Sequence, residues 1–335
     1  MGIRSWINSA SFAALLIFAA PAISAQTNDG IRFVESTNNL QATMARTADD
    51  VSGRDPKVAA VQILLDRAGF SVGVIDGYSG ENFTKALKTY IRENSLDQAD
   101  GAIDVAFERL RQKYPRQPVK EYTVTEEDVR GPFVAEIPED YAERAKMDSL
   151  AYTSVDEMLA EKFHMDIDFL RYLNDGKSLG AAGTTIWVAD TGENKADVKV
   201  KSIVVDVVTG QLLAKDGKGN LVTHYPASIG SKETPSPSGT HKVKAIAIDP
   251  TYTYNPSINF QQGDNDEKLV LPPGPNGPVG SVWIDLSKPT YGIHGTPDPA
   301  LIDKSASHGC VRLTNWDANE LARLVSKGTV VEFKQ

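Results

Sequence analysis

The chain has 335 residues, of which 41% are hydrophobic and 24% are charged, and its formal net charge is -9 at pH 7. Acidic and basic residues are mixed along the sequence, which argues against the clustered basic surface that a nucleic-acid partner requires. The length is sufficient for two or three domains. Cys310 is the single cysteine of the chain, so an intramolecular disulfide cannot form.

Residues 1–25 have the features of a secretory signal peptide. Arg4 gives the start a positive charge, and the apolar run from Phe12 to Ile23 is too short to span a bilayer comfortably. Small residues come next, so we expect cleavage after Ser24 or Ala25, with an uncleaved anchor as the alternative. We therefore expect an exported protein with no integral membrane segment after cleavage.

Residues 26–52 are polar and lack periodicity, and we interpret them as a flexible leader. Residues 53–116 show helical periodicity interrupted by two Asp-Gly turns, which favour a positive φ at the glycine. The three short helices predicted here resemble the peptidoglycan-binding domain found at the ends of cell-wall enzymes. The resemblance implies binding to the glycan of the wall; a helical spacer is the alternative.

Residues 117–145 are punctuated by prolines and are predicted to be a connector. Residues 146–192 then show two short helices, with Ser154 and Asp166 at the positions of their N-terminal caps, followed by a strand. This order resembles the wall-binding LysM module, although the sequence shows no clear first strand.

Residues 197–335 change to a period of two and predict a mostly-β domain. A helix is expected from Trp316 to Val325, capped by Thr314. Residues 255–280 are polar or rich in proline and glycine, and we predict a long loop there. The fold class expected for the whole chain is multidomain α+β.

Cys310 needs a base to act as a nucleophile, because a thiol with an ordinary pKa near ~8.5 is only a few per cent ionised at neutral pH. His308 is separated from Cys310 by one residue and would point the same way in an extended strand. His294 lies in a different β segment and could be oriented more independently. Spacing alone does not decide between the two histidines.

Two glycines lie beside these candidates. Gly309 would let a substrate carbonyl approach backbone N–H groups that stabilise an oxyanion. Gly295 would leave its own carbonyl open to accept the imidazole N–H, which fixes the tautomer as a carboxylate does in other triads.

Four motifs in this order, PSPSGTHKV, PGPNGPVG, IHGTPDP and SASHGCVRL, resemble the catalytic domain of the L,D-transpeptidase family over about residues 197–335. The resemblance implies that Cys310 is the nucleophile, His294 the base and the Gly295 carbonyl the third member of the triad. It also implies an oxyanion and substrate site formed by the backbone N–H groups of His308, Gly309 and Cys310, supported by the side chains of Ser307 and Arg312.

What the resemblance implies for function is acyl transfer on bacterial peptidoglycan, without a cofactor. The thiol would attack the bond between a diamino acid and D-alanine in a tetrapeptide stem and pass the acyl group to an amine, giving a 3→3 cross-link. The same intermediate could instead be hydrolysed, as in an L,D-carboxypeptidase, or transferred to a lipoprotein or an outer-membrane protein. We expect a periplasmic enzyme associated with the wall, with peptidoglycan stem peptides and glycan as partners, that carbapenems acylate.

The sequence also leaves two other classes of function to consider, a zinc enzyme and a non-catalytic wall-binding protein. A zinc site could use His294, His308 and Cys310, but their spacing matches no common zinc signature and no metal is expected. A non-catalytic wall-binding protein would need only the first two modules, and the intact pair of His294 and Cys310 argues against it.

The remaining histidines and one tryptophan are expected to be structural. His164 is predicted to pack or to lie on a helix surface, and His224 and His241 to be ordinary surface or strand residues. Trp316 is predicted to anchor the last helix to the sheet.

Overall fold

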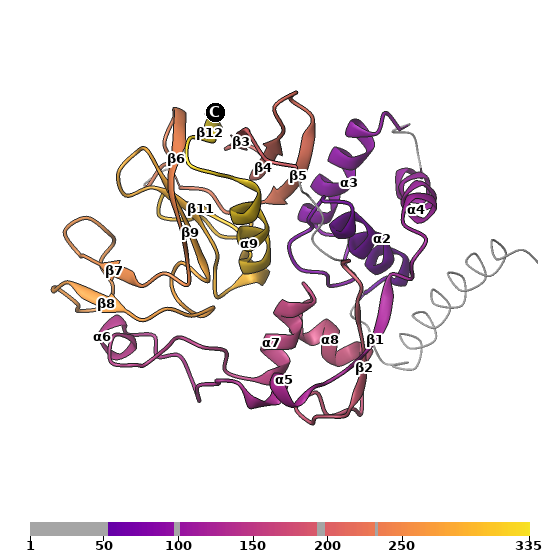
Figure 1. The fold of residues 1–335 in the computed structure, drawn as a ribbon, viewed down its shortest axis with the longest axis horizontal. Helices are drawn as coiled ribbons and strands as arrows, with labels where there is room; N and C mark the ends of the chain where they lie inside the picture. Colours follow the sequence, from indigo (N-terminus) through magenta and orange to yellow (C-terminus); the bar gives the residue numbers. More distant parts are fainter. Residues whose placement is uncertain (1–52, 97–100, 193–197, 232–233) are drawn as a thin grey trace, which may run out of the picture.

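The computed structural model describes residues 53–96, 101–192, 198–231 and 234–335, which form three parts packed against one another (Figure 1). The signal peptide expected in residues 1–25 and the leader expected in residues 26–52 lie outside the described residues. Within the described part of the chain, no helix has both the length and the apolar character needed to cross a bilayer.

The N-terminal part is a bundle of three helices. The first begins after Asp55, whose carboxylate accepts the backbone N–H groups of Lys57 (2.7 Å) and Val58 (3.4 Å). Gly69 follows its end with a φ of 83°, a conformation that glycine adopts without strain. The helices are α2 (Pro56–Arg67), α3 (Glu81–Glu93) and α4 (Ala102–Lys113).

The middle part has the order strand, helix, helix, strand. β1 (Val119–Thr123) pairs antiparallel with β2 (Thr185–Ala189), and α7 (Val155–Lys162) and α8 (Ile167–Leu173) lie between them in the chain. The predicted helices therefore form where expected, and the side chains of Ser154 and Asp166 cap them.

Residues 117–145 are more than the predicted connector, because they contain β1, the strand that the sequence did not reveal. Its sequence, VKEYT, buries one side chain, that of Val119, and so carries no apolar alternation. The strand forms because β2 offers a partner along its whole length.

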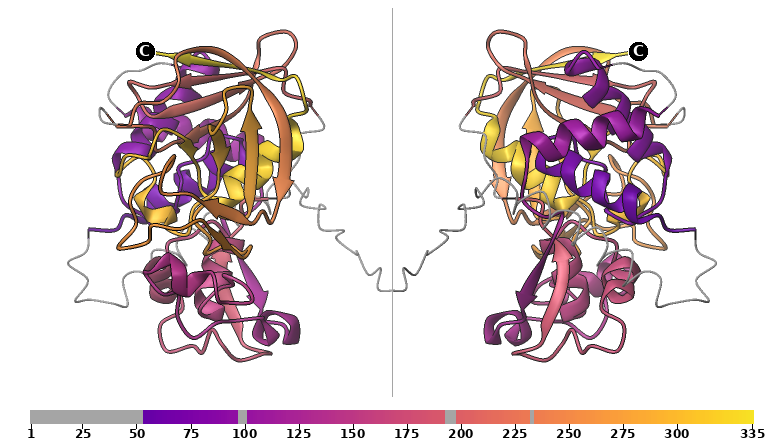
Figure 2. Two further views of the ribbon diagram at one scale, coloured as in Figure 1. Left: turned by 90° about the vertical axis from the view of Figure 1, so that its left-hand side faces the viewer. Right: turned by 90° about the vertical axis from the view of Figure 1, so that its right-hand side faces the viewer.

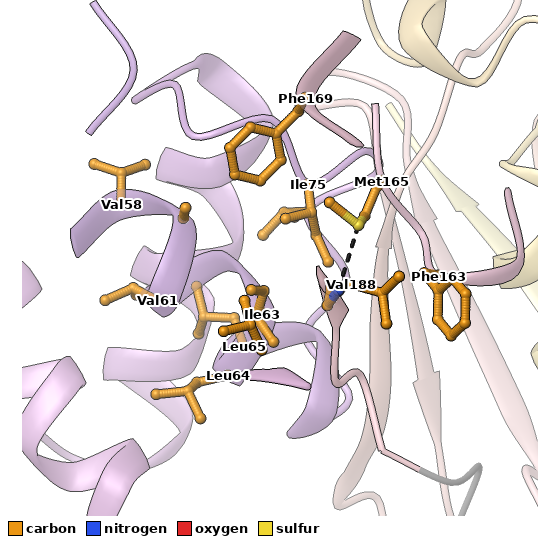
Figure 3. Close-up of a cluster of buried hydrophobic side chains, with 14 of the residues drawn as sticks. Val58, Val61, Ile63, Leu64, Leu65, Ile75, Phe163, Met165, Phe169 and Val188 are labelled. Carbon is orange, nitrogen blue, oxygen red and sulfur yellow. Dashed lines mark hydrogen bonds between the residues drawn. The ribbon is translucent and has the colours of Figure 1, made fainter. Parts of the chain in front are cut away.

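The helical bundle and the middle part share one hydrophobic core (Figure 3). Leu64 and Ile75 of the bundle lie in the same cluster as Phe169 and Val188 of the middle part, and all four are buried. The thioether of Met165 accepts the backbone N–H of Ala189 at 3.3 Å inside this cluster (Figure 3). The two modules are therefore parts of one packed body.

The third part is built on an eight-stranded sheet with the order β11-β10-β9-β6-β12-β3-β4-β5. Two neighbouring pairs, β12 with β3 and β10 with β11, are parallel, and the other pairs are antiparallel. The strands are β3 (Ser202–Asp206), β4 (Gln211–Lys215), β5 (Leu221–Pro226), β6 (Gly239–Ile248), β9 (Val282–Leu286), β10 (Gly292–His294), β11 (Val311–Arg312) and β12 (Val330–Lys334), and a 3₁₀ turn spans Pro299–Leu301.

One helix, α9 (Asn315–Leu324), packs its apolar side chains into the core of the sheet, and Thr314 caps it as predicted. Trp316 differs from expectation: its ring stacks on His164 of the middle part, with centroids 5.2 Å apart. Residue 316 therefore anchors the helix to the neighbouring module. Of the two alternatives expected for His224, a surface or a strand residue, the second holds: it lies in β5 and is fully buried against the bundle, where Ser71 N–H donates to its carbonyl at 3.0 Å.

Residues between β1 and α7 leave the middle part and reach a separate two-stranded sheet of the third part. They contain α5 (Glu126–Arg130) and α6 (Tyr141–Arg144), and Figure 1 shows α6 beside a hairpin of β7 (Tyr252–Tyr254) and β8 (Leu269–Leu271). Figure 2 shows the middle part projecting from the rest of the molecule. β8 falls inside the loop predicted for residues 255–280, because pairing with β7 orders its apolar triplet.

Arg67, at the end of α2, joins the bundle to both ends of the middle part. Its guanidinium donates to the carbonyl oxygens of Asp190 (2.8 Å from Nε), Arg116 (2.8 Å) and Gln117 (2.6 Å), and lies 3.4 Å from the Asp190 carboxylate. The side chain is 1% exposed. A planar fork with several donors fits this arrangement of carbonyls, and an ammonium does not.

We predict that Arg67→Lys lowers the free energy of unfolding by about 3 kcal/mol, because it leaves buried carbonyls and a buried carboxylate without their donors. Urea denaturation followed by circular dichroism measures the change. The control is Arg171→Lys, at a surface ion pair with Asp156, which should change stability by less than about 0.5 kcal/mol. Equal losses of stability in Arg67→Lys and Arg171→Lys would contradict the stabilising role given to the Arg67 guanidinium.

Candidate active site

The predicted site residues meet in a cleft of about 610 Å³ on the catalytic sheet, a volume typical of small-molecule sites. The cleft is lined by Cys310, His294, Ser307, His308 and Arg312. Gly295 and Gly309 are adjacent in the chain to His294 and Cys310. All seven residues that the sequence analysis singled out therefore lie at one place.

The parallel pairing of β10 with β11 brings the histidine and the cysteine together. Ile293 pairs with Val311, and both side chains are fully buried in the core of the sheet. Successive side chains of a strand point to opposite faces, so His294 and the two neighbours of Val311, Cys310 and Arg312, face the cleft. The side chains of His294 and Cys310 therefore face the same cleft because of strand pairing, and not because residues 308–310 are extended.

His294 is held as a neutral base. Its Nδ1 lies 2.6 Å from the carbonyl oxygen of Gly295, and since a carbonyl only accepts, Nδ1 carries the proton. Nε2 is left as the basic nitrogen. The ring stacks on Trp283 with centroids 5.6 Å apart, and burial lowers the pKa of His294 to about 4. The imidazole is therefore uncharged at neutral pH.

The Cys310 thiol is also neutral in this environment. Burial raises the pKa of the thiol, and the opposing influences of the Gly292 N–H and the Arg312 charge are smaller. Sγ lies 3.7 Å from the carbonyl oxygen of Thr290. The free site therefore holds a thiol and an imidazole, both uncharged at neutral pH.

The turn before the cysteine is braced by Ser307. Its hydroxyl donates to the carbonyl of Cys310 in a short hydrogen bond and accepts the N–H of Gly309 at 3.2 Å. Gly309 has a φ of 105°, and a Cβ at that position would lie 2.9 Å from the ring of Tyr291. The Gly309 N–H is thus already used within the turn. Of the three backbone N–H groups expected at the oxyanion site, those of His308 and Cys310 remain as candidates.

His308 does not face the thiol as a base. Its ring is exposed and stacks on Phe260, with centroids 4.1 Å apart and planes 14° apart. The structure thus separates the two histidines that sequence spacing could not: His294 is buried and oriented, and His308 forms part of the cleft wall.

Two arginines form a positively charged part of the cleft lining. Arg312 was predicted from the sequence and Arg144 was not. Arg312 and Arg144 both line the cleft, and neither guanidinium has a carboxylate within salt-bridge distance among the described residues. Arg144 lies over the ring of Tyr141, 5.3 Å from its centroid. The charges of both arginines oppose the raised pKa that burial gives the Tyr141 hydroxyl, so this hydroxyl is within electrostatic reach of both.

Tyr141 and Arg144 come from α6, more than a hundred residues before Cys310 in the chain. The sequence places them in a proline-punctuated stretch and gives no signal of their position. Trp283, under His294, was also missed; the ring lies so close to Gly292 that a Cβ there would be 2.5 Å from it. These contacts join different segments of the chain, so only the folded structure reveals them.

The zinc alternative finds no geometric support in the described part of the chain, where no group of three or more His, Cys, Asp or Glu side chains is placed to hold a metal ion. Of the three donors considered, Nδ1 of His294 is engaged by Gly295 and the ring of His308 is stacked on Phe260.

Comparison with known proteins gives the family. Residues 200–333 match the L,D-transpeptidase catalytic domain, and residues 54–107 match a putative peptidoglycan binding domain. The chain is 31% identical over 177 residues to the putative L,D-transpeptidase YkuD of Bacillus licheniformis and covers 92% of that protein and 53% of its own length. The chain belongs to the L,D-transpeptidase family.

Other relatives agree in name. The putative L,D-transpeptidase YkuD of Bacillus subtilis is 35% identical over 139 residues, which are 81% of that protein and 40% of this chain. The probable L,D-transpeptidase YbiS of Escherichia coli is 33% identical over 141 residues, or 45% of that protein and 41% of this chain. Among solved structures, L,D-transpeptidase 3 from Mycobacterium tuberculosis in complex with a faropenem-derived adduct is 18% identical, with a TM-score of 0.34 over 40% of this chain and 60% of that one.

The prediction of an L,D-transpeptidase with a peptidoglycan-binding module is therefore confirmed at the level of family and fold class. The L,D-transpeptidase is a cell-wall enzyme whose substrate is peptidoglycan. The LysM-like module remains a prediction. Apart from the excursion that carries α5 and α6, residues 119–189 have the order strand, helix, helix, strand that the resemblance implies.

Because the Cys310 thiol is protonated at rest, we predict that its alkylation by iodoacetamide is slower at pH 7.5 than that of an exposed thiol, and still rises above pH 9. Mass spectrometry of the single cysteine measures the rate without ambiguity. The same chain unfolded in guanidinium is the control and should follow an ordinary thiol pKa near ~8.5. A rate that levels off below pH 8 would instead indicate a thiolate paired with an imidazolium.

Proposed function

We propose that this L,D-transpeptidase acts by cysteine acyl transfer on the tetrapeptide stems of peptidoglycan, with Cys310 as nucleophile, His294 as general base and Gly295 as its orienting acceptor. The observation that carries the proposal is the buried imidazole whose Nδ1 is bound to the Gly295 carbonyl in the cleft that contains the thiol. This arrangement leaves one basic nitrogen for proton transfer.

In the first step the sulfur attacks the carbonyl carbon at the L-centre of the diamino acid while its proton passes to Nε2 of His294. The tetrahedral intermediate collapses as the C–N bond to D-alanine breaks, and the imidazolium returns the proton to the departing amine. A thioester on Cys310 remains. In the second step an acceptor amine attacks this thioester, loses a proton to His294, and releases the thiol with a new amide bond.

The oxyanion of each tetrahedral intermediate would be stabilised by backbone N–H groups at His308 and Cys310. The hydroxyl of Ser307 supports this turn by binding the Gly309 N–H and the Cys310 carbonyl. Donors that are already oriented cost no reorganisation when the charge develops, which is the usual basis of this form of catalysis.

Substrate carboxylates would bind the two arginines of the cleft. A stem peptide carries carboxylates next to the bond that is cleaved, and Arg312 is a partly buried guanidinium with no carboxylate partner in the described structure. Burial lowers the pKa of Arg312, which shows that its charge is poorly solvated and would gain from an anion. Arg144 adds a second guanidinium to the lining of the same cleft.

The location and the partners follow from the same proposal. The segment with signal-peptide character would direct export, and the helical bundle would bind the glycan strands next to the stem peptides. The acceptor is a second stem amine in the proposed 3→3 cross-linking reaction. Water would make the enzyme a carboxypeptidase, and an amine of a wall-anchored lipoprotein or outer-membrane protein would make it an anchoring enzyme.

We predict that incubation of the mature enzyme with purified tetrapeptide stems yields a cross-linked dimer with loss of D-alanine, and that Cys310→Ala yields none. Mass spectrometry of the peptides separates a dimer from a trimmed tripeptide. His294→Gln should lower the rate of thioester formation at least about 10³-fold, because the base is lost. A cross-linked dimer or a trimmed tripeptide formed by Cys310→Ala would disprove the nucleophile assignment, and a tripeptide as the sole product of the unsubstituted enzyme would identify water as the acceptor.

We predict that Arg144→Ala raises KM for the tetrapeptide stem about 10-fold with little change in kcat, because the residue binds a carboxylate away from the reacting atoms. Steady-state kinetics with varied stem concentration measures both constants. The control is Lys146→Ala, at an exposed ion pair with Glu143 on the same segment, which should leave both constants within about 2-fold. An unchanged KM in Arg144→Ala would contradict this role.

A further inference from the structure

The side chain of Asn315, the first residue of α9, fills its hydrogen-bonding capacity at the junction between the catalytic sheet and the middle part. Its Oδ1 accepts the backbone N–H groups of Ser281 (3.2 Å) and Thr296 (3.1 Å). Its Nδ2 donates to the carbonyl of Pro275 (3.1 Å) and to Oε2 of Glu161 (3.0 Å). Two donors bind Oδ1 and two acceptors bind Nδ2, so these partners determine the orientation of the Asn315 amide.

One of these bonds acts on His294 through a single peptide group. The N–H of Thr296 and the carbonyl of Gly295 belong to the same planar peptide unit. Asn315 binds one side of that unit, and Nδ1 of His294 binds the other at 2.6 Å. The direction of the carbonyl that orients the imidazole is therefore set by Asn315.

The amide has no room to shift. A Cβ placed on Gly295 or on Gly280 would overlap Oδ1 of Asn315 in either case. Residue 315 is fully buried. Its side chain is enclosed by the backbone of two glycines, so a change in its position would be transmitted to the Gly295 peptide.

Glu161 fixes the other end of the amide from a different module. It lies on α7, and its second oxygen accepts the hydroxyl of Tyr152 at 2.8 Å. Burial raises the pKa of Glu161 to about 7, and the bonds from Asn315 and Tyr152 oppose the shift. No Lys or Arg lies within salt-bridge distance of it among the described residues. Burying a carboxylate in this way costs free energy.

We propose that Glu161 of the middle part is a positioning residue for His294, acting through Asn315 and the Gly295–Thr296 peptide. The middle part is then a working component of the active site as well as a packing partner. The proposal rests on the function proposed above, in which His294 is the base. Glu161 does not line the cleft, so its substitution acts on the base and not on substrate binding.

The test compares Glu161→Ala with Glu161→Gln and with Glu157→Ala in the mature enzyme. Glu157 lies one turn earlier on α7 and binds the catalytic domain through the side-chain amide of Asn276 at 2.7 Å, so it docks the same surfaces without touching Asn315. We expect Glu161→Ala to lower kcat for tetrapeptide stems about 10-fold with KM within 2-fold. Glu161→Gln retains an oxygen acceptor and should stay within about 2-fold of the wild type, as should Glu157→Ala.

A readout without turnover follows the histidine itself. In protein with ¹⁵N-labelled histidine, the Nδ1–H proton of His294 should give a downfield signal, assigned by its loss in His294→Gln. The chain has 5 histidines, so the spectrum is simple. The signal should shift upfield or broaden in Glu161→Ala and remain in place in Glu157→Ala, because only the first substitution frees the Asn315 amide.

Equal losses of kcat in Glu161→Ala and Glu157→Ala, or an unchanged His294 signal in Glu161→Ala, would overturn the proposal and leave Glu161 as a docking residue. These results are distinct from a failure of the proposed function, which would appear as turnover that survives Cys310→Ala or His294→Gln. Should Glu161→Ala fold poorly, Glu161→Met provides a second substitution: it fills a similar volume without a buried charge and cannot accept the Asn315 N–H, so the same shift or broadening of the His294 signal is expected.

Discussion

The parallel pairing of β10 with β11 is the constraint on which the site depends. It buries Ile293 and Val311 together in the core, and the alternation of side chains then obliges His294 and Cys310 to face the cleft. A shift by one residue would place the thiol in the core and a valine in the cleft. The hydrophobic free energy that fixes the core therefore also fixes the positions of His294 and Cys310, and the polar contacts around them only refine the orientation of one ring.

The modules of this chain are coupled more closely than a series of separate domains. The helical bundle and the middle part share one core (Figure 3), and α9 of the catalytic domain contacts both, through Ser71 with Asp317 at 2.9 Å and through Trp316 with His164. These contacts lie on the side of α9 that faces away from the sheet. The helix transmits the position of the middle part to the loop that carries Gly295, because Asn315 lies at its first turn.

Local sequence was sufficient for most helices, for the family and for the fold class, because capping residues, hydrophobic period and motifs are each contained in short stretches of the chain. Non-local contacts were beyond it. β1 carries no apolar alternation, and only its pairing with β2 reveals it. The choice between His294 and His308, the burial of His224 and the cleft position of Arg144 each depend on which distant segments meet, and no short stretch of sequence encodes that.

The wall that α6 contributes has a consequence for inhibitor design. The region matched by the catalytic-domain profile, residues 200–333, excludes Tyr141 and Arg144, although both line the same cleft as the thiol. A compound shaped against an isolated catalytic domain would meet an open flank there, whereas in the intact molecule it would meet an aromatic ring and a guanidinium. Selectivity between members of the family can therefore be sought in groups that reach toward this flank.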